Sequence, residues 1–332
     1  MSNFIEAVCV HFSLGKLIKP PQRVYGGLLH VMWRVDTDKA SYAVKQLSKD
    51  INLTNERVVK NYELSERIAS RFVAQGIPGV SAIEKSGKYL LIVDTIGFLV
   101  YPWVEAKALD QHAVSEEHAL KVAAILAKMH SLNVNEPEVI PLEYSTTTNE
   151  QILELIDKAE SFDSSFAKAL RKNQNEILAA NEAYQNAMPI LKKVLVVSHG
   201  DLDQKNVLWN KDSNPILIDW ESAGKVNPTY DIINTAFYWS GITTHFDQQL
   251  FFKMMDTYQQ AGGVIYADHV IAACYGALSW IGWLVYNIER ACVQGESEQK
   301  TVGTEQVNQT LATILRLQTV IPDVIKNIED RL

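Results

Sequence analysis

The amino-acid sequence predicts an α+β protein in which a small antiparallel-sheet lobe, residues 1–104, precedes a large and mostly helical lobe, residues 105–332. Short runs of strand character, each closed by turn residues, dominate the first lobe. From Leu109 onward, apolar residues recur mainly at the spacing of an amphipathic helix. The stretch from Val194 to Glu221 is the exception, because short apolar strands return there inside the helical lobe.

The predicted small lobe consists of a mostly antiparallel sheet with one main helix. That helix carries Ile68, Ala69 and Phe72 at helical spacing. Gly76 and Pro78 end it, because glycine readily caps a helix and proline cannot continue one. The predicted elements are a short helix over 4–14, strands over 28–35 and 41–47, one or two helices over 52–75, and strands over 89–94 and 98–103.

The predicted large lobe is helical on both sides of a strand-rich insertion. A helix opens at Ser115, and helical spacing returns over 149–192. After Asp231 the chain is expected to be helical to its end, apart from a polar stretch around residues 294–306. The inserted strands are expected over 194–197, 206–209 and 216–219.

The bulk composition is that of an ordinary globular protein, with 47% hydrophobic and 21% charged residues among 332. No apolar run approaches the roughly 20 residues that span a bilayer, and the N-terminus lacks the pattern of a signal peptide. Three cysteines, an odd number in no metal-ligand pattern, indicate buried thiols in a reducing compartment. We therefore expect a cytoplasmic protein without a membrane partner, as a monomer or a weak homodimer.

The net charge of −8 is unevenly distributed along the chain. Residues 1–104 hold 13 basic and 9 acidic residues, a balance of +4, so the remainder carries −12. An acidic body of this kind argues against nucleic acid as a partner. It would suit a cationic small molecule, although the acidic balance could equally serve only solubility.

The segment Ser198-His199-Gly200-Asp201-Leu202-Asp203-Gln204-Lys205-Asn206 has the residue types that phosphoryl transfer needs, with Asp219 thirteen residues after Asn206. Moving a phosphoryl group mainly requires positioning and charge neutralisation. One carboxylate must orient the acceptor hydroxyl, while an amide oxygen and a second carboxylate can hold Mg²⁺, which prefers oxygen ligands. A hairpin after the loop would bring Asp219 back beside Asn206.

These residues resemble the catalytic and metal-binding motifs of the aminoglycoside phosphotransferase/choline kinase family, whose pattern is H-G-D-x-x-x-x-N followed by a strand ending in D-[WF]-[ED]. The resemblance implies a bilobed, protein-kinase-like fold. It also implies an ATP-dependent small-molecule kinase that uses Mg²⁺, with GTP as an alternative donor. By this resemblance, Asp201 is the catalytic carboxylate, and Asn206 and Asp219 are the metal ligands. Asp231 would have a structural role, as a helix N-cap or a brace of the catalytic loop.

Four further residues of the resembling motifs have less defined roles. His199 and His130 are expected to be structural rather than catalytic. For Lys205 two interpretations stay open, a contact with a phosphate or exposure to solvent, of which we favour solvent. The role of Asp203, which stands where protein kinases of the Ser/Thr type usually have a lysine, also stays open.

A cation and its carboxylate partner are expected on the nucleotide side. Lys45, in Tyr42-Ala43-Val44-Lys45, resembles the strand lysine of the V-A-I-K motif. Glu63 and Glu66 compete as its partner, and we favour Glu66 because Ala69 lies on the same helical face.

Backbone groups are expected to complete the nucleotide site. Gly26 and Gly27 would lie between two strands, where their amides could cover the phosphates, although a Gly-Gly pair could equally be a hairpin turn. Tyr101, Trp103 and Val104 occupy the place of the hinge that would bind adenine through its backbone.

The acceptor is the least determined part of the prediction. It is expected near Trp239, Ser240, Trp280, Trp283, Tyr286, Glu289 and Arg290, where aromatic faces could hold a cationic or ring-shaped molecule, although helical spacing indicates that most of these aromatic residues are core. An aminoglycoside-like molecule or another amine would suit the acidic lobe, but a sugar, homoserine or another metabolite is equally compatible. Two other functional classes compete with this prediction, a catalytically silent nucleotide-binding regulator and a protein kinase. Against the protein kinase, Tyr230 follows only eleven positions after Asp219, which leaves too few residues for a phosphorylatable activation loop.

Overall fold

A computed structural model describes residues 2–24, 30–110, 113–139, 141, 147–293 and 297–330. Its contacts divide the chain into two compact units. The sheet unit comprises 1–109, 134–139 and 199–224, and the helical unit comprises 110–133, 140–198 and 225–332. The expected boundary after residue 104 places the catalytic segment in the second domain, whereas these contacts group residues 199–224 with the N-terminal sheet.

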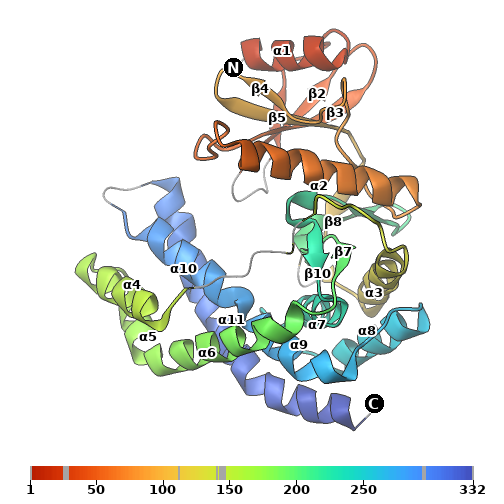
Figure 1. Ribbon diagram of the computed structural model, residues 1–332. Coiled ribbons are helices and arrows are strands. Elements are labelled where there is room, and N and C mark those ends of the chain that lie inside the picture. Colours follow the sequence, from red (N-terminus) through yellow and green to blue (C-terminus); the bar gives the residue numbers. More distant parts are fainter. Residues whose placement is uncertain are drawn as a thin grey trace. The chain divides into compact units, whose positions relative to one another are not determined.

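The sheet unit is built on a five-stranded antiparallel sheet in the order β1-β2-β3-β5-β4 (Figure 1). Its register pairs Lys45 of β3 with Met32 of β2 and Leu99 of β5. The elements are α1 (Ser2–Phe12), β1 (Gln22–Val24), β2 (Val31–Asp36), β3 (Ser41–Gln46), α2 (Glu56–Ala74), β4 (Leu91–Val93) and β5 (Ile96–Pro102). Each element that the sequence predicted in this region is present, with shifts of a few residues at its ends.

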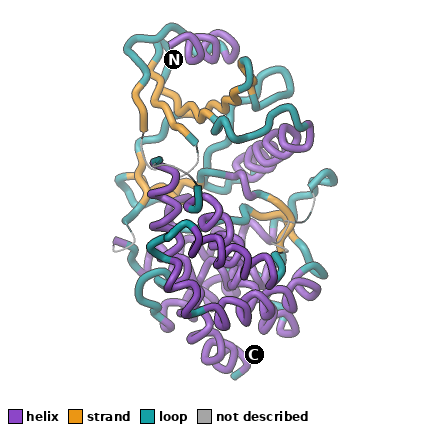
Figure 2. The backbone as a smooth tube through the Cα atoms, turned by 90° about the vertical axis from the view of Figure 1, so that its left-hand side faces the viewer, coloured by secondary structure: helices purple, strands orange, loops and turns teal. Residues whose placement is uncertain are grey.

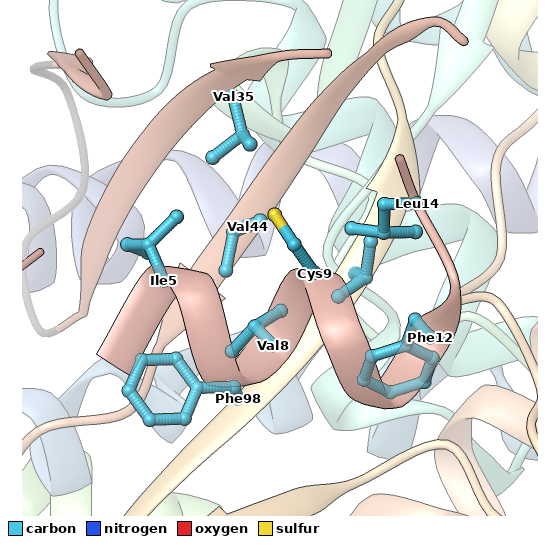
Figure 3. Close-up of a cluster of buried hydrophobic side chains, with 9 residues drawn as sticks. Ile5, Val8, Cys9, Phe12, Leu14, Val35, Val44 and Phe98 are labelled. Atoms are coloured by element: carbon cyan, nitrogen blue, oxygen red, sulfur yellow. The ribbon is translucent and has the colours of Figure 1, made fainter. Parts of the chain in front are cut away.

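The two faces of this sheet pack against different groups of side chains, because successive side chains of a strand point to opposite sides. Val44 and Phe98 belong to the apolar cluster that α1 covers with Ile5 and Val8 (Figure 3). Their neighbours therefore face the other way. Leu99 and Tyr101 belong to a second cluster, which includes Val59 and Tyr62 of α2. This alternation directs Lys45 away from the α1 cluster.

Helix α2 has local features that define both of its ends. The side chain of Asn55 accepts a hydrogen bond from the backbone N–H of Arg57, which satisfies one of the free donors of the first turn. At the other end Gly76 has a φ of +80°, a conformation that glycine adopts without steric cost. The interior buries Ile68, Ala69 and Phe72, as their spacing predicted.

A second, three-stranded sheet of the same unit carries the segment singled out by the sequence. Its order is β6-β8-β9, built from β6 (Ala106–Ala108), β8 (Val207–Asn210) and β9 (Pro215–Leu217). Strands β8 and β9 form an antiparallel hairpin in which Val207 pairs with Leu217. This register returns the chain after β9 to the level of the residue before β8, which is Asn206.

The helical unit consists mostly of helices, drawn in purple in Figure 2. Ser115 caps α3 with a reciprocal capping box, as the sequence indicated. The helices are α3 (Glu116–Ser131), α4 (Asn149–Ser161), α5 (Ala167–Lys172), α6 (Gln174–Leu191), α7 (Pro228–Trp239), α8 (Gln248–Gln260), α9 (Val270–Gly276), α10 (Trp280–Ala291) and α11 (Glu298–Glu329). Two short strands, β7 (Val196–Ser198) and β10 (Gly224–Val226), pair with each other.

The C-terminal helix corrects one expectation. Residues 294–306 were expected to interrupt the helical region because they are polar, yet α11 begins within this stretch at Glu298 and continues for 32 residues. Residues 294–296 lie outside the described part of the chain. The side chain of Ser297 accepts from the backbone N–H of Lys300, so the polar stretch supplies the cap of the helix. Buried Val307 and Leu311 then anchor α11 within the helical unit.

One stretch of the described chain, Ala267–Ala291, has the length and the mean hydropathy of a possible membrane span. Buried positions make up 56% of it, and a core helix of a globular unit has the same properties, so the observation is weak. The three cysteines, Cys9, Cys274 and Cys292, are free and buried, as the sequence predicted.

Candidate active site

In the predicted catalytic segment, the two residues after Ser198 fix the path of the loop. His199 is buried, its Nε2 lies 2.9 Å from the carbonyl oxygen of Ile218, and its ring packs on Trp220 at 4.6 Å. Gly200 follows with a φ of +79°, and a Cβ on it would lie 2.2 Å from the backbone oxygen of Ser222. The loop therefore requires glycine at this position for both its conformation and its packing. The structural role expected for His199 agrees with these contacts.

Asp201 and Asn206 lie side by side at the ends of the loop. The Asn206 side-chain amide Nδ2 donates to the backbone oxygen and to the Oδ2 atom of Asp201, at 2.9 Å each. Because a carboxylate only accepts hydrogen bonds, this pairing turns the amide nitrogen toward Asp201 and leaves the Oδ1 atom of Asn206 available to a cation. The backbone oxygen of Asn206 also accepts from the N–H of Ile218, which ties the loop to the strand that leads to Asp219.

Asp219 follows β9 in a left-handed conformation, with φ and ψ of +61° and +64°. Such a backbone is uncommon outside glycine, although aspartate tolerates it better than most residues, and it is often found at functional sites. Its Oδ1 accepts from the Nζ of Lys45 at 2.8 Å, while its side chain is 41% exposed. The carboxylate is thus held at one oxygen and remains accessible.

The structure differs from the sequence in the partner of Lys45. Its ammonium pairs with Asp219 and with Glu221, rather than with the expected Glu66. Burial acts to lower the pKa of Lys45, but the two carboxylates outweigh it and raise that pKa above its usual value. Lys45 is therefore a buried, fully charged cation beside Asp219.

His30 completes this ion-pair group and was not expected from the sequence. The backbone N–H of Ser48 donates to its Nδ1 at 3.1 Å, so the neutral ring carries its proton on Nε2 and donates to Glu221 Oε2 at 3.2 Å. Burial acts to raise the pKa of Glu221, but the hydrogen bond from His30 and the charge of Lys45 hold that pKa at about 2. The ionised Glu221 thus links His30 to Lys45.

Glu66 is the inward-facing glutamate of α2, as its helical position predicted, and it is only 1% exposed. Its two oxygens accept from the backbone N–H of Ala82 at 2.8 Å and from the hydroxyl of Tyr101 at 2.5 Å. Burial raises the pKa of Glu66 to about 7, although both hydrogen bonds act to lower it. Glu63, the competing residue, instead accepts from the backbone N–H groups of Tyr89 and Leu90.

The expected hinge residues lie at the end of β5 and just after it. Tyr101 is buried and uses its hydroxyl on Glu66. The Trp103 indole donates to Glu105 at 2.8 Å and lies under the guanidinium of Arg34 at 4.5 Å. Val104 has its carbonyl in a tight turn that accepts from Ala106. Their contact with adenine stays a prediction, and the predicted Gly26 and Gly27 lie outside the described residues.

The oxygen atoms at this site fit a magnesium ion that is shared with a ligand. Asn206 Oδ1 and the accessible Asp219 carboxylate are the hard oxygen donors that Mg²⁺ prefers. Within the described residues, no group of three or more His, Cys, Asp and Glu side chains could hold a metal ion by itself. Two protein ligands suit Mg²⁺ in nucleotide enzymes, because the ion keeps several waters and takes the remaining ligands from phosphates.

Asp231 has the bracing role that the sequence left as one of two alternatives. Asn227, not Asp231, caps α7. The Oδ2 atom of Asp231 accepts from the Ser198 hydroxyl at 2.5 Å and lies 3.0 Å from Nε2 of His130, whose Nδ1 lies 2.7 Å from the hydroxyl of Tyr258. All four side chains are buried. This network anchors Ser198, the first residue of the predicted catalytic segment.

The aromatic residues considered for the acceptor separate into buried and accessible ones. Trp239 and Ser240 are buried and belong to the core of the helical unit. On α10, Trp283 and Tyr286 stack with their ring centroids 5.3 Å apart, and Tyr286 is exposed. The guanidinium of Arg290 lies 6.0 Å from the centre of the Tyr286 ring. The accessible face of α10 is therefore an aromatic pair next to a cation.

Two residues of the site, Glu221 and His30, were not predicted from the sequence, for different reasons. Glu221 was visible as the last residue of the Asp219-Trp220-Glu221 motif, and its acidic character could have suggested a contact with Lys45. His30 offered no local pattern, because its partner Glu221 lies 191 residues away in the sequence.

Comparisons with known proteins identify a family and a fold for this chain. A family model described as the phosphotransferase enzyme family matches residues 22–262. A search of curated proteins found no match. Among solved structures, a spectinomycin phosphotransferase in complex with ADP and spectinomycin is similar with a TM-score of 0.70 at 13% identity, and the match covers 96% of this chain and 98% of the other.

Two further solved structures show the same fold. The choline kinase of Streptococcus pneumoniae has a TM-score of 0.59 at 17% identity, covering 94% of this chain and 99% of the other. An amicoumacin kinase in complex with AMP-PNP, Ca²⁺ and Ami has a TM-score of 0.63 at 14% identity, and the match covers 97% of this chain and 96% of the other. The predicted fold class, an antiparallel sheet followed by a large helical part of the protein-kinase-like type, is confirmed.

Proposed function

The chain belongs to the phosphotransferase enzyme family, whose model matches well over half of it, and on this premise we propose that it transfers the γ-phosphoryl group of ATP to a hydroxyl group of a small molecule. The family and the kinases of the same fold support the coarser activity, a small-molecule kinase or phosphotransferase. The proposal that ATP is the donor and a hydroxyl group the acceptor rests on one observation. A single compact unit contains Asp201, Asn206, Asp219 and Lys45.

In the proposed reaction, Asp201 orients the acceptor hydroxyl and accepts its proton. The acceptor oxygen then forms a bond to the γ-phosphorus, and the bond from that phosphorus to the β–γ bridging oxygen breaks, which releases ADP. The hydrogen bond from Asn206 to Oδ2 of Asp201 supports this role, because it fixes the carboxylate relative to the loop. A positioned base of this kind typically contributes a factor of about 10² to 10⁴ to the rate.

The other residues of the group would hold the donor. Lys45 supplies a buried positive charge for the nucleotide phosphates, and its orientation depends on Asp219 and Glu221. Asn206 and Asp219 would hold Mg²⁺, which when bound neutralises charge on the phosphates. Since these two side chains are too few to retain the ion by themselves, Mg²⁺ should bind tightly only together with a nucleotide.

The net charge of −12 over residues 105–332 would suit a cationic acceptor, such as an aminoglycoside-like compound or a smaller amine alcohol. A sugar, homoserine or another metabolite is equally compatible with the sequence, so the test must cover all of these classes.

The proposal can be tested by measuring Mg²⁺-dependent ADP formation from ATP across a panel of aminoglycosides, amine alcohols, sugars and homoserine. We expect turnover with at least one acceptor and a fall in kcat of at least about a hundredfold in Asp201→Asn. Asp212→Asn, in the exposed turn between β8 and β9, is the matched control and should retain full activity. Tight nucleotide binding without turnover on any acceptor would instead indicate a regulator, and equal activity in Asp201→Asn would exclude its catalytic role.

A further inference from the structure

In the predicted catalytic loop, the carboxylate of Asp203 holds Lys205 at two points, the backbone N–H and the side-chain ammonium. The Oδ2 atom of Asp203 lies 2.8 Å from the Nζ of Lys205, and its Oδ1 accepts from the backbone N–H of the same lysine at 2.8 Å. Asp203 also caps the short 3₁₀ turn Gln204–Asn206. These contacts hold the Lys205 side chain along the loop, where 57% of it remains exposed.

This side-chain conformation places the ammonium group of Lys205 beside Asp201. Lys205 Nζ lies 3.8 Å from Oδ2 of Asp201, the same oxygen to which Asn206 donates. The side chain of Asp203 is 17% exposed, whereas those of Asp201 and Lys205 are 32% and 57% exposed. Within the Asp203–Lys205 pair, the lysine is therefore the residue that is more accessible to an incoming ligand.

The charges around Asp201 create a need for a cation at this place. A γ-phosphoryl group next to Asp201 would meet two loop carboxylates, and its transfer proceeds through a state with charge spread over three oxygens. Lys45 is buried and already paired with Asp219 and Glu221. Lys205, in contrast, makes an ion pair that reaches Asp201 itself.

We propose that Lys205 is a further catalytic residue, which contacts the γ-phosphoryl group during its transfer, and that Asp203 is the positioning residue that holds it there. This inference rests on the proposed function and goes beyond it, because it assigns a separate cation to the γ-phosphate. It reverses our expectation that Lys205 only faces solvent, since an unpaired solvated lysine would not be held at both ends. It also gives a role to Asp203, which the sequence left open.

A merely structural role for Lys205 would be to neutralise Asp201 and Asp203, and it makes a different prediction about ligands. A contact with the γ-phosphate strengthens the binding of a nucleoside triphosphate but not of a diphosphate. Neutralisation of the loop would affect both nucleotides alike, because it does not depend on the third phosphate. The ratio of the two affinities therefore separates the two roles without relying on turnover.

The experiment compares Lys205→Met with Lys211→Met, a change of an exposed lysine in the turn between β8 and β9. Binding of ADP and of AMP-PNP is measured by calorimetry on the full chain with Mg²⁺, and kcat is measured on the best acceptor. In Lys205→Met we expect AMP-PNP to bind at least about fivefold more weakly, ADP to change less than twofold, and kcat to fall about 10² to 10³-fold, the usual effect of removing one preorganised transition-state contact. Lys211→Met should match the unmodified chain in all three.

Two further variants test the positioning by Asp203 and guard against misfolding. Asp203→Asn keeps the lysine but weakens its tether, so kcat should fall about tenfold, less than in Lys205→Met. Lys205→Gln repeats the charge removal with a polar side chain, and thermal unfolding identifies any variant that does not fold.

The inference is overturned if Lys205→Met and Lys211→Met have kcat values within threefold of each other, or if both nucleotides lose affinity equally in Lys205→Met. Failure of the proposed function looks different, because the unmodified chain would then show no turnover on any acceptor. In that case the AMP-PNP to ADP affinity ratio still decides whether Lys205 contacts the γ-phosphate.

Discussion

Replacement of Glu66 by glutamine should change how the stability of this protein depends on pH. Glu66 is only 1% exposed, and burial raises its pKa from an ordinary 4.5 to about 7. As the pH rises from about 4.5 to 7, the unfolded chain loses the Glu66 proton while the folded chain retains it. The unfolded state thus binds fewer protons in this window, and the free energy of unfolding falls as the pH increases.

The size of the effect follows from the shift of about 2.5 pH units between 4.5 and 7. At 1.36 kcal/mol per unit, the stability contribution of Glu66 that is present below pH 4.5 decreases by about 3 kcal/mol by the time the pH exceeds 7. Glutamine mimics the protonated side chain and has no proton to lose. The free energy of unfolding of Glu66→Gln, minus that of the unmodified protein, should therefore increase by about 3 kcal/mol between about pH 4.5 and pH 8.

Urea unfolding followed by tryptophan fluorescence at a series of pH values measures this difference, because every other titrating group is common to both proteins. Tyr101→Phe supplies a second test, since the Tyr101 hydroxyl donates to Glu66 at 2.5 Å and acts to lower its pKa. Without that hydrogen bond, the upper end of the window should move above pH 7. A difference that stays flat or decreases with pH would refute the reasoning about burial.

Two other changes test the loop and the ion-pair group. Gly200→Ala should destabilise the protein by about 2 kcal/mol or more in urea unfolding, because it adds a Cβ at 2.2 Å from the oxygen of Ser222 to the strain of a positive φ. Gly87→Ala has a similar φ of +81° with open space around it, so an equal cost for both would contradict the steric part. His30→Ala removes a hydrogen bond to ionised Glu221 and should weaken ATP binding about fivefold or more, with a smaller loss in His30→Gln, which retains a donor. Unchanged ATP affinity in His30→Ala would show that His30 does not position the group.

The sequence was informative wherever function depends on residues that are close along the chain. Asp201 and Asn206 are five residues apart, and the glycine between His199 and Asp201 has a conformation that few other residues tolerate. The turn-bounded strands after the loop formed the expected hairpin, which returns Asp219 to the neighbourhood of Asn206. Local spacing and turn chemistry determine such features, so they can be predicted from the residues themselves.

The ion-pair partner of Lys45 could not be predicted from local spacing. Periodicity placed Glu66 on the inner face of α2, which is correct, but it did not indicate what Glu66 would meet there. Once inside, Glu66 is held by a backbone N–H and by Tyr101. Lys45 instead pairs with Asp219 and Glu221, which lie more than 170 residues further along the chain.

The order of strands and helices, the predicted catalytic segment and the family resemblance could all be read from the residues, because each depends on short-range pattern and spacing. The pairing of Lys45, the link through His30 and the placement of the Lys205 ammonium beside Asp201 became visible only in the folded chain. These contacts depend on which long side chains meet after the strands and helices have packed. The physical reason is that an ion pair is selected by distance and burial in three dimensions, and neither quantity is encoded in the spacing of residues along the chain.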